Sequence, residues 1–265
     1  EDSLFIMKID LYGVQQWMKK YDFGSGESIK QTSDGGYIVC GDNGENNLTN
    51  GWGWGYDLPW IIKTNSNGII MWDTVFTVSS DDWIRSIEQT NDGGYITSGR
   101  IQDTLTNEWN IWYLKLDSLG SLVFEKTLSS PFNSSEGREI TQTNDGGYII
   151  TGCNGSNFSN VWLIKTNSLG DTLWTKKFGD PLRFNTGMSV EQTNDGGYII
   201  GGYTEYNFGL NSGDIYVIKT DENGNITSTI EIPKPSSNRK LDKVIDLLGR
   251  ETKPQKNTPF IEIYD

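Results

Sequence analysis

One eight-residue segment recurs along the chain and constrains its fold more than any other feature. Gln-Thr-Asn-Asp-Gly-Gly-Tyr-Ile begins at Gln89, Gln142 and Gln192, and a copy with Ser in place of Asn begins at Gln31. Its aspartates are 58, 53 and 50 residues apart in the order Asp34, Asp92, Asp145 and Asp195. A period of this length indicates a solenoid or a β-propeller.

A second motif alternates with the first. It starts with an aromatic residue three positions before a lysine, and its five copies start at Phe5, Trp60, Trp112, Trp162 and Tyr216. The segment is apolar on both faces, so sheets must cover it on both sides. Together the motifs predict 18 short strands. We therefore expect an all-β β-propeller of about five four-stranded units of 50–58 residues over residues 1–232, or a fragment of a larger ring.

The Asp-Gly pairs are expected to have a structural role, because they supply the positive φ angles of tight turns between strands. We expect each turn to join the fourth strand of one unit to the first strand of the next. The turn residues are Asp34 and Gly35, Asp92 and Gly93, Asp145 and Gly146, and Asp195 and Gly196. The lysines of the second motif are expected to pair with local Asp or backbone carbonyls. A shared anionic site in the central channel is the alternative.

An aromatic residue follows the glycine of the second motif at the fourth position in four copies, as Trp17, Trp72, Phe124 and Trp174. This pattern resembles the tryptophan-docking repeat of quinoprotein-type β-propellers, although the interval from Asp to Gly is one residue shorter. The resemblance implies that these rings lock neighbouring blades. The cysteine pair and acidic metal ligands of quinoprotein dehydrogenases have no counterpart, so neither a cofactor nor a metal is expected.

Composition excludes several classes of function. The 265 residues include no histidine, which removes the commonest general base and the imidazole ligands of most metal sites. The formal charge of −13 would repel nucleic acid. No apolar run approaches the length of a membrane span. Cys40 and Cys153 are expected to be buried free thiols.

The repeat ends near residue 232, and a linker rich in Pro and Ser over 233–240 leads to a different tail over 241–265. The tail predicts strands over 243–248 and 259–264. It resembles the C-terminal sorting tails of the type IX secretion system, through Val244, Asp246, Gly249, Arg250, Ile261 and Tyr264. The resemblance implies export by a Sec signal and the type IX machinery to the outer cell surface or the medium, with an incomplete signal here. A β-hairpin packed on the last blade is the alternative.

Departures from the repeat are the best candidates for function. An insertion over 42–59 places Trp52, Trp54 and Tyr56 on a Gly-rich loop beside Asn47 and Asp57. Exposed rings there could stack on sugars or grip a peptide, or fold back over the blade edge. Lesser candidates are the segments 81–83 and 101–110, each with carboxylates beside a tryptophan.

The sequence favours a secreted or cell-surface binding and adhesion module, with a glycan or another surface protein as its partner. Two alternatives stay open. One is a secreted polysaccharide hydrolase or lyase that works with carboxylates, because such chemistry needs no histidine. The other is a purely structural surface protein. Whether the chain is an enzyme is therefore left open, and no catalytic residue is assigned.

Overall fold

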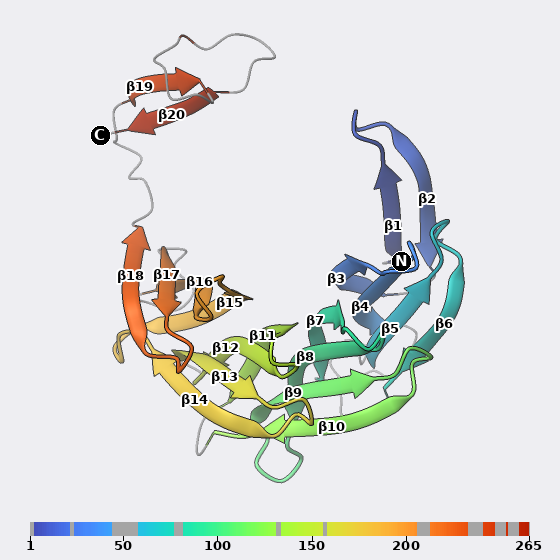
Figure 1. Cartoon of the computed structure of the whole chain (residues 1–265), viewed down its shortest axis with the longest axis horizontal. Coiled ribbons are helices and arrows are strands. Elements are labelled where there is room, and N and C mark those ends of the chain that lie inside the picture. Colours follow the sequence, from blue (N-terminus) through green and yellow to red (C-terminus); the bar gives the residue numbers. More distant parts are fainter. Residues whose placement is uncertain are drawn as a thin grey trace, which may run out of the picture. The chain divides into compact units, whose positions relative to one another are not determined.

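The computed structural model describes residues 3–21, 24–43, 58–76, 82–130, 134–155, 158–205, 213–232, 241–246, 253 and 260–264. These residues form 20 β-strands and no helix (Figure 1), so the all-β prediction is confirmed. No helix in this part of the chain could cross a bilayer. The chain divides into two compact units, Glu1–Glu231 and Ile232–Asp265.

The first unit consists of sheets whose strands follow one another in the chain. A two-stranded sheet holds β1 (Leu4–Ile9) and β2 (Gln15–Tyr21), and four sheets of four strands follow. They are β3 (Ser25–Gln31), β4 (Tyr37–Asn43), β5 (Leu58–Thr64) and β6 (Ile70–Val75); β7 (Trp83–Gln89), β8 (Tyr95–Gln102), β9 (Trp109–Leu116) and β10 (Leu122–Leu128); β11 (Ser135–Gln142), β12 (Tyr148–Asn154), β13 (Asn160–Thr166) and β14 (Thr172–Phe178); and β15 (Phe184–Gln192), β16 (Tyr198–Glu205), β17 (Asp214–Thr220) and β18 (Ile226–Ile232).

The sheets of the first unit follow one another in chain order and do not close into a ring (Figure 1). The two-stranded sheet contains only the third and fourth strands of a repeat. Its Phe5 is 63% exposed, whereas the equivalent Trp112 in a complete sheet is 1% exposed. Trp112 packs in one core cluster with residues of the preceding sheet, such as Ile38 and Ile61, whereas no described sheet precedes the two-stranded one in the chain.

The Asp-Gly turns connect strands of the same sheet, so the expected connection between neighbouring units is wrong. Gln142 pairs with Tyr148 across the turn between β11 and β12, which are the first two strands of one sheet. The sequence repeat looks the same whichever strand is counted first. Hydrogen-bonded pairing determines which four strands form one sheet, and each sheet begins one strand earlier than the sequence suggested.

The two glycines of each turn meet different requirements. Gly146 has a φ of +81°, which favours glycine, and its equivalents in the other turns have φ between +80° and +83°. At Gly147 a Cβ atom would lie 2.2 Å from the Thr166 carbonyl oxygen. Oδ1 of Asp145 accepts hydrogen bonds from Thr143 Oγ1 at 2.5 Å and from the Gly147 N–H at 3.0 Å. Every residue of the turn therefore has a defined structural task.

Each of these aspartates also pairs with the lysine of the second motif. Lys165, buried in β13, donates to Asp145 Oδ2 at 2.8 Å and to the Thr166 carbonyl at 2.8 Å. The other pairs are Lys63 with Asp34, Lys115 with Asp92 and Lys219 with Asp195, at 2.8, 3.0 and 2.8 Å. The expected local pairing is confirmed for these four lysines. Lys8 lies in the two-stranded sheet, which has no turn of this type among its described residues.

Aromatic rings connect successive sheets. Trp72 in β6 meets Tyr95 in β8 edge to face, with centroids 5.6 Å apart, and a Cβ at Gly120 would lie 2.8 Å from the Trp72 ring. Equivalent ring pairs are Trp17 with Tyr37, Phe124 with Tyr148 and Trp174 with Tyr198, at 5.8, 6.2 and 5.9 Å. The fourth strand of each sheet thus packs a ring against the second strand and the following glycine turn of the next sheet.

The glutamine of the repeated segment adds a polar link between sheets. Gln142 accepts the Asn91 N–H of the preceding turn at 2.8 Å and donates to the Gly146 carbonyl of its own turn at 3.3 Å. Gln89 and Gln192 make the same two contacts. The side chain therefore fixes the spacing of adjacent turns.

The second unit contains one antiparallel pair, β19 (Leu241–Asp246) and β20 (Phe260–Tyr264). The first strand begins two residues before the predicted one. Val244 and Asp246 lie in β19, and Ile261 and Tyr264 lie in β20. Gly249, Arg250 and the linker over 233–240 lie outside the described residues.

The close approach at the second glycine gives a test within one sheet. At Gly197 a Cβ atom would lie 2.0 Å from the Thr220 carbonyl oxygen, whereas at Gly201 nothing lies within 4 Å. We expect Gly197→Ala to lower the free energy of unfolding by about 2–3 kcal/mol, because backbone cannot yield easily. Gly201→Ala should leave it unchanged or raise it by up to about 1 kcal/mol. Urea denaturation measures both, and equal losses would refute this role of the second glycine.

The turn aspartates predict sensitivity to acid. The hydrogen bond from Lys63 lowers the pKa of Asp34 to about 2. At Asp92 and Asp145 burial opposes the shift, but hydrogen bonds from the turn and the lysine lower the pKa to about 2. Because these pKa values lie below the unfolded value, about 3.9, the stabilisation is complete above about pH 5 and is lost as pH falls towards 2.

The measurement is the urea midpoint between pH 5 and pH 2.5. Asp34→Asn/Asp92→Asn/Asp145→Asn should flatten this dependence, because Asn still accepts the turn hydrogen bonds but does not titrate. Glu222→Gln, at an exposed carboxylate, is the control. An unchanged pH dependence in the triple variant would show that other groups cause the acid sensitivity.

Candidate functional site

The sheets of the first unit have two unlike edges. One edge carries the short Asp-Gly turns and the glycine turns of the second motif, and we call it the turn edge. The opposite edge carries longer connections of variable length, such as those between β4 and β5 and between β8 and β9, and we call it the loop edge. Because the turn edge is occupied by repeated structural contacts, variation is concentrated at the loop edge.

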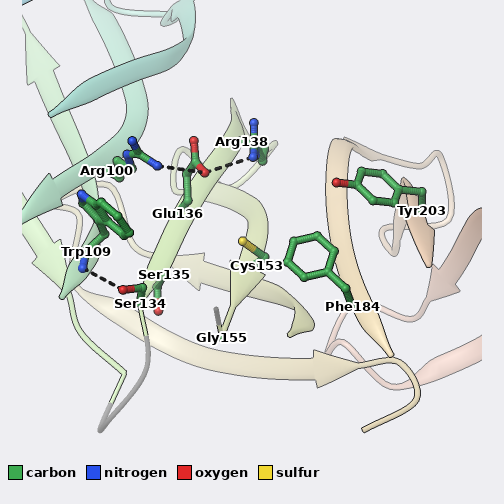
Figure 2. Close-up of a pocket in the computed structure, with 10 residues that line it drawn as sticks. All are labelled: Arg100, Trp109, Ser134, Ser135, Glu136, Arg138, Cys153, Gly155, Phe184 and Tyr203. Carbon is green, nitrogen blue, oxygen red and sulfur yellow. Dashed lines mark hydrogen bonds and ion pairs between the residues drawn. The ribbon is translucent and has the colours of Figure 1, made fainter. Parts of the chain in front are cut away.

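A pocket of about 310 Å³ lies at the loop edge where three successive sheets meet (Figure 2). We call it the arginine-aromatic pocket. Three aromatic residues line it, Trp109 at the start of β9, Phe184 in β15 and Tyr203 in β16. Its charged lining residues are Arg100, Glu136 and Arg138. Apolar surface with a few convergent polar groups is the usual composition of a small-molecule site.

Glu136 is the electrostatic centre of this pocket. Its buried carboxylate accepts from Arg85 Nε at 2.7 Å and pairs with a terminal nitrogen of Arg138 at 3.0 Å. Arg100 lies at 3.9 Å from the same carboxylate. Arg85 also donates to Glu27 at 2.7 Å. A buried carboxylate needs such partners, and this one orients three guanidinium groups.

Two tryptophans hold the arginines in place. The Arg100 guanidinium carbon lies 4.7 Å from the Trp83 ring centroid and 4.5 Å from that of Trp109. Arg85 lies 3.9 Å from the Trp83 ring. These are cation-π distances, and they restrict the rotamers of both arginines. The pocket therefore presents preorganised donors beside apolar ring surfaces.

The first strand of each four-stranded sheet has a register shift at the same place, between Gly26 and Ser28, Ile84 and Ser86, Gly137 and Glu139, and Gly187 and Ser189. The extra residues at these bulges are Glu27, Arg85, Arg138 and Met188. Such bulges redirect side chains and are common beside functional sites. All four residues line a second pocket of about 260 Å³, which shares Arg138 with the first.

A third pocket, of about 490 Å³, is acidic and continues along β11 towards the turn edge. It contains Glu88, Glu139 and Glu191 with Lys30 and Thr141, and it shares Glu139 with the second pocket. Burial raises the pKa of Glu88, against opposing hydrogen-bond and charge effects from Thr141 and Lys30. Glu139 accepts the Val190 N–H at 2.7 Å. The three pockets thus follow one another along the first strands.

The sequence-predicted loop residues Trp52, Trp54, Tyr56, Asn47 and Asp57 all lie outside the described residues. In the sequence, these residues stand between β4 and β5. The two lesser candidate segments supply Trp83 and Trp109, which the structure brings together around Arg100. The Gln102 N–H also donates to Asp82 Oδ1 at 2.6 Å, which joins these segments directly.

The bulge residues and Glu136 were not among the residues predicted from the sequence. A signal was present, because the bulge position stands four residues before each repeated glutamine and holds Glu, Arg, Arg and Met in turn. This variation next to a repeated segment marks a position that the fold does not restrict. Glu136 precedes the third bulge by two residues, and nothing in the sequence alone singles it out.

The described residues include no group of three or more His, Cys, Asp or Glu arranged to hold a metal. Cys40 and Cys153 are buried free thiols, as expected. Burial raises the pKa of Cys153, which lines the arginine-aromatic pocket, so its thiol is a poor nucleophile near neutral pH.

No protein family model matches the chain, and no curated protein matches it. Solved structures do. The chain is similar to a protein of unknown function from Dyadobacter fermentans, with a TM-score of 0.53, 13% identity and coverage of 82% of this chain and 74% of the other. It is also similar to a mannose phosphorylase from Leishmania mexicana bound to phosphate, with a TM-score of 0.50, 10% identity and coverage of 88% and 73%.

A third similar structure is an α-L-arabinanase from Penicillium chrysogenum complexed with arabinobiose. The TM-score is 0.53, the identity is 14%, and the match covers 86% of this chain and 68% of the other. At such low identity these similarities establish the fold alone. The chain therefore has a β-propeller-like fold of four-stranded antiparallel sheets, as the repeats predicted.

Proposed function

We propose that the chain is a glycan-binding propeller and that the arginine-aromatic pocket is its binding site. The observation that supports this proposal is the combination of three ring systems with fixed guanidinium donors in one pocket. Aromatic faces cover the C–H surface of a sugar ring, while planar donors bind its oxygens. The similar mannose phosphorylase and arabinanase act on sugars in their own right. That similarity makes a glycan a reasonable ligand to test first.

The lining of this pocket favours binding over hydrolysis. Glycoside hydrolysis usually needs two carboxylates across the scissile bond, one of them protonated. Glu136 is the single carboxylate among the residues that line the pocket, and guanidinium groups surround it. A carboxylate held in this way orients donors, and the pocket lining has no second carboxylate to work with it.

A hydrolase is the second candidate, and the acidic pocket supports it. Glu88 has a raised pKa through burial and lies close enough to Glu139 for their charges to interact. Glu139 accepts the Val190 N–H at 2.7 Å and lines both the acidic pocket and the second pocket. Carboxylates in such unlike environments can divide acid and base roles. In this case glycan would be cut in the acidic pocket after binding at the loop edge.

We also propose that the tail over 241–265 directs export through the type IX machinery and that the protein acts at the cell surface or in the medium. The order of Val244, Asp246, Gly249 and Arg250 followed by Ile261 and Tyr264 supports the sorting role. Pairing of β19 with β20 agrees equally with an ordinary hairpin. Adhesion to a glycan or a surface protein is then the expected role of the binding site.

Binding to a glycan array that carries neutral and acidic oligosaccharides tests the main proposal. We expect Trp109→Ala and Tyr203→Ala each to weaken binding at least about tenfold, as loss of a central aromatic contact does. Tyr12→Ala, at a ring 82% exposed in the turn after β1, should not change it. Trp52→Ala/Trp54→Ala measures the contribution of the insertion. If the wild type retains no glycan, the proposed function is wrong.

The same oligosaccharides distinguish the two candidate functions. A binding module retains glycan without turnover, whereas a hydrolase releases reducing ends. Turnover that is lost in Glu88→Gln, with binding retained, would favour the second candidate.

The sorting proposal is tested by fusion of residues 241–265 to a carrier with a Sec leader in a host that has type IX secretion. We expect more carrier outside the outer membrane than with the leader alone, and Gly249→Ala/Arg250→Ala should reverse this gain. Equal distribution of carrier with and without the tail would contradict a sorting role for this segment.

A further inference from the structure

The arginine-aromatic pocket has an excess of positive charge, although the whole chain carries a formal charge of −13. Its lining residues include two guanidinium groups, Arg100 and Arg138, and one carboxylate, Glu136. Arg85 stands outside this lining and is shared between Glu136 and Glu27. Guanidinium groups thus outnumber carboxylates in the lining by two to one. Limited exposure to water strengthens the attraction of such a lining for an anion.

Within the part of the chain that the structure describes, two hydrogen-bond donors of the pocket lining have no acceptor. They are Arg138 Nε and Trp109 Nε1, and both atoms are buried. Leaving buried donors unpaired is costly, so native proteins usually satisfy them. Both groups are donors, and what they need is an acceptor. An ionised carboxylate accepts only, and its two oxygens can satisfy several donors at once.

The geometry of Arg138 suits a carboxylate. One terminal nitrogen is bound to Glu136 at 3.0 Å, which fixes the guanidinium plane, and the bulge in β11 fixes its backbone. A planar guanidinium matches a planar carboxylate through two parallel hydrogen bonds. Arg138, Glu136 and Tyr203 all line the pocket (Figure 2), so a group bound to Arg138 occupies a pocket that also contains an aromatic ring.

We propose that the arginine-aromatic pocket selects acidic glycans and that Arg138 recognises the carboxylate of a uronic acid residue. This inference rests on the proposed glycan-binding function and names its ligand class. The sugar ring packs against Trp109 and Tyr203 while its carboxylate meets the unpaired donors. Neutral sugars supply the ring contact but bring no charged acceptor to the unpaired donors.

The experiment compares two ligands that differ only in charge. Galacturonate oligosaccharides and their methyl esters have the same sugar and the same linkage, but the esters lack the negative charge. Titration calorimetry with the full chain should show at least about tenfold tighter binding of the acid form, as expected for a charge-assisted hydrogen bond. Binding of the acid form should weaken as salt is raised, because salt screens the attraction.

Variants at Arg138 separate charge from geometry. Arg138→Gln should remove the preference for the acid form, while Arg138→Lys should keep part of it, because lysine retains the charge without the planar fork. Lys126→Gln changes the net charge equally at an exposed pair with Asp171 outside the pocket, and it should bind like the wild type. Thermal melting identifies any variant that fails to fold. If Arg138→Gln does not fold, the ratio of the affinities for acid and ester is measured in Arg138→Lys instead.

The outcomes distinguish this inference from the function on which it rests. Equal affinity for acid and ester, unchanged in Arg138→Gln, would overturn the carboxylate preference and leave glycan binding intact. Neutral glycans bound without any acidic ones would do the same. Equal binding of a sulfated galactan would show that the pocket reads negative charge and not a carboxylate. If no glycan of either kind binds, the proposed function itself fails.

Discussion

An aromatic ring on the fourth strand of each sheet packs edge to face against the first tyrosine of the second strand in the next sheet. The ring also covers a glycine turn where a Cβ atom would collide with it, as at Gly120 and Trp72. This contact needs both partners, so it links the sequence of one repeat to that of its neighbour. Successive first strands contact one another, and two of the pockets are lined mainly by residues of these strands.

The repeated eight residues combine most of the contacts that hold this arrangement. The glutamine joins adjacent turns, the aspartate pairs with a buried lysine, and the two glycines meet separate requirements of φ and of space. The tyrosine receives the docking ring. Little of this segment can vary without loss of stability. Function must therefore use positions outside it, which are the bulges and the loop edge.

The sequence predicted the class of fold, the number of strands in the first unit and the local partners of four lysines, because a periodic pattern reports periodic contacts. It misplaced the start of the unit, since a repeat has no intrinsic first strand. Less of the candidate site could be predicted from the sequence. Trp83 and Trp109 were noted in separate segments, but their meeting around Arg100 depends on how two connections of one sheet fold together. The role of Glu136 depends on its ion pairs with arginines on three different strands, which the sequence does not show.

Stability alone does not account for the cluster around Glu136. Burying an ionised group costs more free energy than its pairing returns in many proteins, and apolar residues of similar size would fill the same space with no such cost. The bulge position can hold an apolar residue in place of a charged one. Met188 occupies it in the last sheet, whereas Arg85 and Arg138 occupy it in the two sheets before. The fold thus does not require a charge there. What the arginines add is a fixed set of donors that face a pocket, and a ligand rich in acceptors is what makes such a set useful.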